Sequence, residues 1–165
     1  MSANPSVTQS EVNELLSKQE NLCNDFYEKL SSLDASLRSS RPSPEEWSVA
    51  DILHHMVDSD LHFATRYIFN LTSERPTIVP FDESKYPTQL NYQHRSFEIS
   101  LTAHKAIGAT VRDLLSQAAI ESWNRISIHP ERGEKTLFEL AQLGFGHLQG
   151  HINHIDEVVS RLSQG

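Results

Sequence analysis

Apolar residues recur along the chain at steps of three and four positions, which is the period of an amphipathic α-helix. Four segments show this pattern. The first covers about residues 7–33 and the second about residues 48–71. The third covers about residues 89–118, and the fourth covers about residues 136–162. The pattern therefore predicts four long helices, each with one apolar face.

Prolines and capping residues mark where these helices end and begin. Two prolines within residues 41–44 forbid a helix that continues past the first segment. Ser48 and Thr136 each stand three positions before an acidic residue, which is the capping-box pattern of a helix N-terminus. Residues 74–87 hold three prolines and are predicted to form a long crossover loop. Residues 123–135 are predicted to be irregular or a short extended piece.

Four long helices with little strand pattern predict an all-α fold, a four-helix bundle. The third helix has a long connection on either side of it, which favours crossovers over an up-down-up-down bundle with tight turns. The length of 165 residues fits one domain, so we expect a single bundle domain over residues 1–165.

The charge balance narrows the function. Lys plus Arg number 14 and Asp plus Glu number 22, so the net charge is 14 − 22 = −8. An acidic chain is a poor general binder of nucleic acid or of anionic lipid. No apolar run approaches the about 20 residues that span a bilayer, and the first residues lack the pattern of a signal peptide. The single cysteine, Cys23, is expected in the core, and the protein is expected to be soluble and cytoplasmic.

Nine histidines make metal binding the chemistry to consider first. His147 and His151 stand four positions apart on the predicted fourth helix, so their Cβ atoms lie about 5–6 Å apart on one face. Two such imidazoles can bind one divalent metal ion. His154 lies close to the same face and could be a third ligand, a group that orients a ligand, or a proton carrier. A solvated face that carries histidines by chance is the alternative.

Three glycines accompany these histidines on the same predicted helix: Gly144, Gly146 and Gly150. Each costs about 0.8–1.0 kcal/mol relative to alanine inside a helix. The glycines make sense if another helix approaches closely, or if the histidines need room beside them. A helix that frays or kinks near Gly144 is the alternative.

The predicted second helix offers a further ligand. His55, Asp58 and His62 share one face, and His55 lies beside the expected core positions, so it can point into the bundle. His54 is rotated by about 100° and is expected at the edge of the helix. One histidine from this helix and the pair on the fourth give three protein ligands, which leaves open positions for water or substrate.

The remaining histidines, His94, His104 and His129, fit no ligand spacing and are expected at the surface or at the edge of the core. Trp47 directly precedes the Ser48 cap and is expected to pack against the start of the second helix.

Taken in order, these motifs resemble the DinB/YfiT-like superfamily. The resemblance is carried by residues 47–55 and 147–155, and its YfiT branch in particular by residues 80–83 and 129–137. It extends over nearly the whole chain, and the order and spacing of the motifs make the set specific. Gly150 departs from the pattern, because YfiT-like members often carry another histidine there. That departure bears on the chemistry beside the site and not on the metal.

The resemblance implies a four-helix bundle that holds one divalent metal ion, zinc or nickel, on His55, His147 and His151. It also implies a homodimer that acts on a small-molecule substrate. Members of the family include S-transferases and isomerases that use a low-molecular-weight thiol, namely bacillithiol, mycothiol or glutathione, and proteins described as metal-dependent hydrolases.

Two functions of different class follow. The first is a metalloenzyme in which the metal activates water or a thiol, with His154 and Asp58 as candidate catalytic residues that orient a ligand or transfer a proton. Arg66, Arg95 and Lys105 could bind the anionic parts of a thiol, or they are solvated helix charges. The second is a non-catalytic dimeric binding or sensor module with a structural or vestigial metal site.

Overall fold

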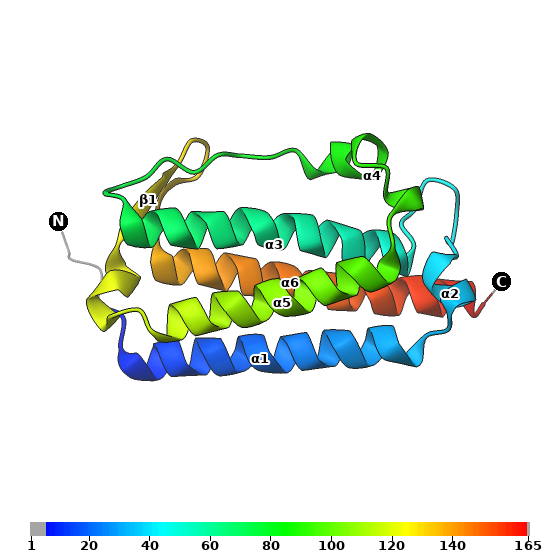
Figure 1. Ribbon diagram of the computed structural model, residues 1–165, viewed down its shortest axis with the longest axis horizontal. Coiled ribbons are helices and arrows are strands. Elements are labelled where there is room, and N and C mark those ends of the chain that lie inside the picture. The colour runs from blue at the N-terminus through cyan, green and yellow to red at the C-terminus, as the bar shows by residue number, and fades with distance from the viewer. Residues whose placement is uncertain (1–5, 165) are drawn as a thin grey trace.

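The computed structural model describes residues 6–164. Its long helices are α1 (Gln9–Ser32), α3 (Val49–Thr72), α5 (Phe97–Ser116) and α6 (Leu137–Leu162), which lie side by side (Figure 1). Helices α1 and α3 each pack against both α5 and α6. The predicted four-helix bundle is therefore confirmed.

The connection from α3 to α5 gives the bundle its topology. It covers residues 73–96 and returns along the outside of the bundle over the length of α3 before α5 begins (Figure 1). Helices α3 and α5 consequently point in the same direction, and α1 and α6 point in the opposite one (Figure 1). This arrangement is the crossover topology that the long connections predicted.

Short helices interrupt the crossover, namely η1 (Glu83–Lys85), α4 (Tyr86–Gln89) and η2 (Tyr92–His94). The predicted start of the third helix near residue 89 was wrong, because α5 begins at Phe97. Asn91 has a left-handed backbone, with φ of 55°, which a continuing helix cannot accommodate. Ser96 then accepts a hydrogen bond from the amide of Ile99 and caps α5.

Four more short elements were not predicted or were predicted only loosely. A five-residue helix, α2 (Ala35–Ser39), follows α1 and is capped by Asp34. The segment predicted as irregular or extended contains η3 (Ile120–Asn124) and a hairpin of β1 (Ile126–His129) and β2 (Gly133–Thr136).

The hairpin fastens the start of the crossover to the bundle. Its strands are antiparallel, with His129 opposite Gly133 next to the turn. The amide of Ile78 donates to the carbonyl of Ile128 at 2.8 Å, and the amide of Ile128 donates to the carbonyl of Pro76 at the same distance. The crossover therefore begins as a third extended segment beside β1.

Both predicted capping boxes are confirmed. The Ser48 hydroxyl accepts from the amide of Asp51 at 3.1 Å, and the Asp51 carboxylate accepts from the amide of Ser48 at 2.8 Å. Thr136 and Glu139 make the same reciprocal pair at 3.1 and 2.8 Å. These caps fix where α3 and α6 begin.

Gly144 explains part of the glycine pattern. A Cβ atom at this position would overlap the Tyr67 hydroxyl and crowd the Phe63 ring, so α6 needs glycine there for α3 to approach. Apart from the helix's own neighbouring residues, no atom of residues 6–164 lies within 4 Å of a Cβ built on Gly146 or Gly150. The close-approach interpretation is therefore right for Gly144 alone.

Two histidines predicted at an edge are buried, and for both that prediction was wrong. His54 is 1% exposed, and its Nδ1 lies 2.8 Å from the Ser100 hydroxyl, because α5 covers that side of α3. His104 is also 1% exposed, with its Nδ1 2.9 Å from the Tyr27 hydroxyl and its Nε2 3.3 Å from an Asp60 oxygen.

The predicted positions of His94, His129 and Cys23 agree with the structure. His94 is exposed and His129 is half-buried. Cys23 lies in the core, and burial raises the pKa of its thiol to about 11.

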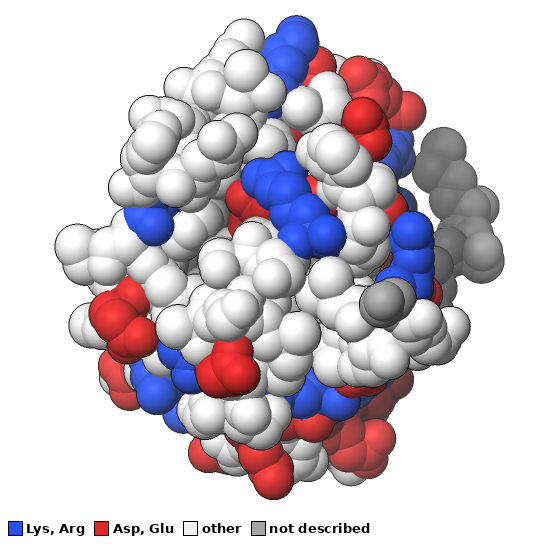
Figure 2. Space-filling model, turned by 90° about the vertical axis from the view of Figure 1, so that its right-hand side faces the viewer, with Lys and Arg blue, Asp and Glu red and all other residues white. Residues whose placement is uncertain are grey.

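None of the helices in residues 6–164 has the length and apolar character to cross a membrane. Basic and acidic residues are interspersed on the end of the molecule seen in Figure 2, without a continuous basic patch.

Candidate metal centre

The ring nitrogens of three histidines converge where α3 faces α6. His55 comes from α3, and His147 and His151 come from consecutive turns of α6. The Nε2 atom of His147 lies 3.2 Å from that of His55 and 3.2 Å from that of His151. A nitrogen of each lies within 4.8 Å of the other two. His55 is fully buried, and the other two are half-buried.

Burial keeps these imidazoles neutral. It is the largest cause that lowers the pKa of His55 and of His151, each to about 3, and the neighbouring histidines lower both further. Burial also lowers the pKa of His147. Near pH 7 all three rings are uncharged, and a neutral imidazole nitrogen is the form that binds a metal ion.

The donor set fits a divalent metal ion. Only one proton can lie between two Nε2 atoms 3.2 Å apart, so three such atoms cannot all satisfy one another. Within residues 6–164 the Nδ1 atom of each ring is buried without a hydrogen-bond partner. A cation that accepts the three Nε2 lone pairs would leave the proton of each ring on Nδ1 and resolve the crowding.

Two further side chains reach this centre. The Glu83 carboxylate lies 3.7 Å from His55 Nε2 and 3.8 Å from His147 Nε2. The Ser59 hydroxyl lies 3.3 Å from His55 Nε2. Neither was predicted as a site residue. The spacing of four between His55 and Ser59 on one helix could have indicated the serine. Glu83 belongs to residues 80–83, which carry part of the family resemblance, but no spacing relates it to the histidines, because the crossover brings it in.

Trp47 forms a wall of the centre, which goes beyond the predicted packing at the start of the helix. Its ring is parallel to that of His151 within 5° at a centroid distance of 6.0 Å, and it lies 5.0 Å from that of His55. The His154 ring lies 5.8 Å from that of His151. Among the described residues, His154 is not one of those whose nitrogens converge, so it is a neighbour of the ligand set.

The structure gives Asp58 and His62 other contacts. An Asp58 oxygen accepts hydrogen bonds from the Tyr92 hydroxyl at 2.8 Å and from an Arg95 Nη at 2.7 Å. Asp58 thereby ties α3 to the end of the crossover. His62 lies 2.6 Å from the Tyr86 hydroxyl through Nε2 and stacks on Phe81 at 4.2 Å.

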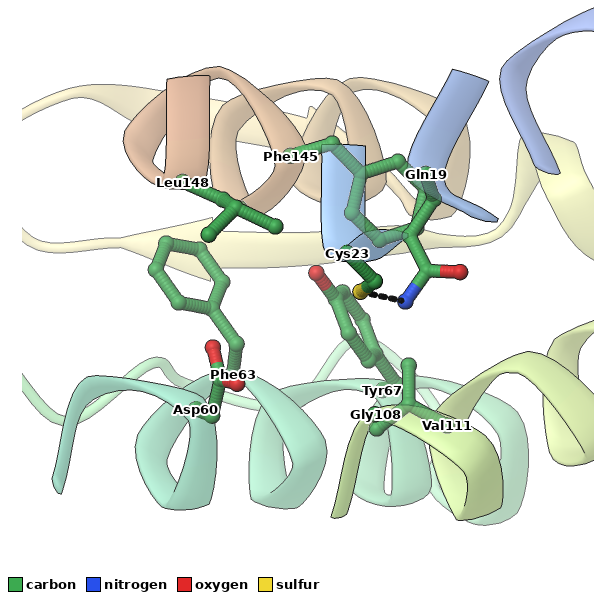
Figure 3. A pocket seen from close by; sticks show the side chains of 10 residues that line it. Gln19, Cys23, Asp60, Phe63, Tyr67, Gly108, Val111, Phe145 and Leu148 are labelled. Atoms are coloured by element: carbon green, nitrogen blue, oxygen red, sulfur yellow. Dashed lines mark hydrogen bonds between the residues drawn. The ribbon is translucent and has the colours of Figure 1, made fainter. Parts of the chain in front are cut away.

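A cavity of about 410 Å³ opens beside His147 and Glu83. Ligand pockets commonly hold about 300–1,000 Å³, so a small substrate fits. A second cavity lies inside the bundle between Asp60, Tyr67 and Cys23 (Figure 3). It measures about 30 Å³, which is too small for a substrate. The larger cavity therefore reaches the histidine centre at His147.

Known proteins resemble this chain over nearly its full length. A model of the DinB superfamily matches residues 21–155. A protein of Bacillus cereus strain 03BB102 named "Putative metal-dependent hydrolase" is 26% identical over 157 residues, which cover 95% of this chain and 90% of that protein. A protein of the same description from Bacillus thuringiensis subsp. konkukian shows the same identity and coverage.

A solved structure supports the same fold. YfiT from Bacillus subtilis, described as "a probable metal-dependent hydrolase with an unusual four-helix bundle topology", superposes with a TM-score of 0.85. The match covers 99% of this chain and 94% of that chain at 21% identity.

Proposed function

The chain belongs to the DinB superfamily, and on that premise we propose that it is a metal-dependent enzyme whose nucleophile is water or a low-molecular-weight thiol. His55, His147 and His151 would hold one divalent ion, zinc or nickel. The convergence of their nitrogens beside an open cavity is the observation that carries this proposal. Three ligands leave positions free for a nucleophile, whereas structural sites are commonly closed by a fourth protein ligand.

When bound, the metal supplies Lewis-acid chemistry that lowers the pKa of water or holds a thiol as thiolate. Glu83 is placed to take up the nucleophile's proton, because its carboxylate faces the same Nε2 atoms from the cavity side. Trp47 shields His55 and His151 from water on another side. In this proposal His154, whose ring centroid lies 5.8 Å from that of His151, would be the residue that orients that ligand ring.

Hydrolysis is the first reaction to test, because the named relatives are described as metal-dependent hydrolases and a carboxylate suits proton removal from water. S-transfer differs only in the nucleophile. The non-catalytic binding or sensor module is the contrasting function, in which metal binds without turnover.

Metal content per chain tests the centre. Untagged protein, purified without chelator, is measured by mass spectrometry beside His147→Ala and the control His94→Ala, which changes an exposed histidine. We expect about one zinc or nickel per chain in the wild type and in the control, and almost none in His147→Ala. Equal metal in all three proteins would refute the assignment.

Turnover then tests catalysis. The metal-loaded protein is assayed with p-nitrophenyl acetate, and with bacillithiol plus 1-chloro-2,4-dinitrobenzene. We expect Glu83→Gln to keep its metal and to lower kcat by about 10²–10⁴-fold, which is the usual contribution of a general base. Glu131→Gln, which removes another carboxylate from the same cavity, should keep both. Metal binding without turnover in either assay, that of the ester or that of the thiol with its electrophile, would favour the non-catalytic module.

A further inference from the structure

The cavity beside His147 has walls from four parts of the fold. Helix α3, the crossover, the turn between β1 and β2, and α6 all contribute. The histidine centre lies at one end of this cavity, where His147 and Glu83 meet. What lines the rest of the cavity indicates which molecules it takes.

Arginines without a carboxylate partner gather here. Most arginines between residues 6 and 164 lie within 4.0 Å of a carboxylate. Arg125 has no such carboxylate among the described residues, but it donates at 2.7 Å to the carbonyls of Asn70 and Ser73. Among the arginines of the described chain, only Arg66 and Arg132 lie near no carboxylate and donate to no pair of backbone carbonyls. Both of them line this cavity.

Arg66 is held in place with donors to spare. Its guanidinium carbon lies 5.0 Å from the centroid of the Phe63 ring and 5.1 Å from that of the Phe81 ring. One Nη atom donates to the carbonyl of Val79 at 3.3 Å. Over residues 6–164 the other Nη atom makes no hydrogen bond and is not buried, and Nε is buried without a partner. A guanidinium fixed between two rings with unused N–H groups is suited to a planar anion.

The surroundings of Arg66 favour negative charge. Burial lowers the pKa of Arg66, and the like charge of Arg132 contributes to the lowering. Burial also lowers the pKa of His129, with Arg132 and Arg66 as further causes, so the three basic groups lie near one another. His129 Nδ1 accepts the amides of residues 131 and 132 at 3.2 Å, which orders this turn and leaves the ring's proton on Nε2.

Three acidic side chains also line the cavity, but among the described residues none of them lies within 4.0 Å of Arg66 or Arg132. Asp82 pairs with Lys85 at 2.9 Å, and Glu83 faces the histidines. Glu131 is exposed and forms no ion pair within the described residues. Apolar surface lies between the two ends, from the rings of Phe63 and Phe81 and from Leu143, whose side chain is 42% exposed.

We propose that this cavity binds a small carboxylate with an aromatic or similarly flat apolar body. Arg66 and Arg132 hold the carboxylate, and Phe63, Phe81 and Leu143 hold the body. The Phe63 ring lies between the two ends, since it contacts the Arg66 guanidinium and lies 6.2 Å from the His147 ring. The reactive group of the bound ligand would point to the histidine centre. Only this orientation rests on the proposed function.

Binding of phenylacetate tests the site without metal. The probe is titrated into the full chain carrying His147→Ala, and amide shifts are followed by ¹H–¹⁵N NMR. We expect saturable shifts at Phe63, Arg132 and Leu143. The neutral isostere phenylacetamide should bind at least about tenfold more weakly, because it lacks the charge that strengthens hydrogen bonds to arginine. Equal binding of the two probes would overturn the proposal.

Substitution of the arginines tests the assignment of residues. Arg66→Met and Arg132→Met should each weaken phenylacetate by about ten- to a hundredfold, which is the range for a lost hydrogen bond to a charged group. Arg38→Met is the matched control, because Arg38 also lies over a ring, that of Phe97 at 4.5 Å, but pairs with Glu98 outside this cavity. Unchanged affinity in both cavity variants, or a loss equal to theirs in the control, would refute the site.

The outcome separates this inference from the proposed function. Binding that depends on Arg66 in a protein without turnover would leave the carboxylate site standing and the enzyme refuted. Turnover of neutral esters, together with no phenylacetate binding, would leave the enzyme standing and refute the carboxylate site. Inorganic phosphate that binds more tightly than phenylacetate at the same amides would also overturn it.

Discussion

The Nε2 atoms of His55 and His147 lie 3.2 Å apart, although 92 positions separate the two residues in the sequence. The packing of α3 on α6 brings them together, and the buried apolar face of each helix decides which of its side chains face the other. Because the centre bridges two helices, a metal bound there would stabilise the folded bundle in addition to supplying the chemistry of the site.

Zinc should therefore raise the free energy of unfolding. A ligand that binds only the native state adds about 2.7 kcal/mol at a hundredfold excess over its Kd. We expect this gain in the wild type and its loss in His151→Ala, which keeps only two of the three converging nitrogens. Urea unfolding with zinc and with chelator measures both. A zinc gain in His151→Ala as large as that in His94→Ala would contradict the ligand set.

The stability of the metal-free protein should fall in mild acid. Burial lowers the pKa of His54 to about 4 and that of His55 to about 3. Between these values and the unfolded pKa, the unfolded chain therefore binds protons at these two histidines and the native state does not. Their stabilisation is present above the unfolded pKa of about 6.5 and is lost as the pH falls toward 4. Each such histidine contributes up to about 1.4 kcal/mol per pH unit.

Asp60 acts in the opposite direction. Burial raises the pKa of its carboxyl to about 7, so its stabilisation is present in acid and is lost as the pH rises toward 7. Between pH 5.5 and 7.5 its effect is about one and a half times that of one histidine. Urea unfolding at pH 7.5 and 5.5, with chelator, should still show lower stability at pH 5.5. His54→Gln should reduce the difference, and His94→Gln should leave it unchanged; equal stability at both pH values would contradict the argument.

Two glycines of α6 should respond oppositely to alanine. Gly144→Ala should cost about 1–3 kcal/mol, because the new methyl group meets Tyr67 and Phe63 and overpacking in a core costs that much. Gly150→Ala has open space and should gain up to about 1 kcal/mol in helix propensity. Thermal unfolding compares them. Tyr67→Phe should lower the cost of Gly144→Ala, and an unchanged cost would show that the hydroxyl is not the obstacle.

Asp58→Asn separates a tie between elements from a role in metal chemistry. The substitution removes the charge that Arg95 and Tyr92 bind, and the expected cost is about 1–3 kcal/mol of stability. Metal content should stay near one per chain. A variant that folds normally but loses its metal would instead place Asp58 in the support of the centre.

The sequence by itself determined the features that depend on near neighbours in the chain. The apolar period gave the four long helices, and Ser48 and Thr136 gave two of their starts, because capping involves residues three positions apart. The spacing of His147 and His151 likewise placed both on one face of α6. The start of α5 was missed, since the left-handed backbone at Asn91 has no distinct signal in an apolar pattern.

Only the tertiary structure decided what lies across from each helix. His54 and His104 are buried because another helix covers them, and helical spacing says nothing of which helix that is. Glu83 reaches the histidines because the crossover returns over α3. Arg66 and Arg132 line the same cavity because the hairpin lies beside that crossover. Such pairings join distant parts of the chain through packing. The local sequence pattern therefore could not predict the relative placement of the three histidines, the position of Glu83 beside them, or the cavity.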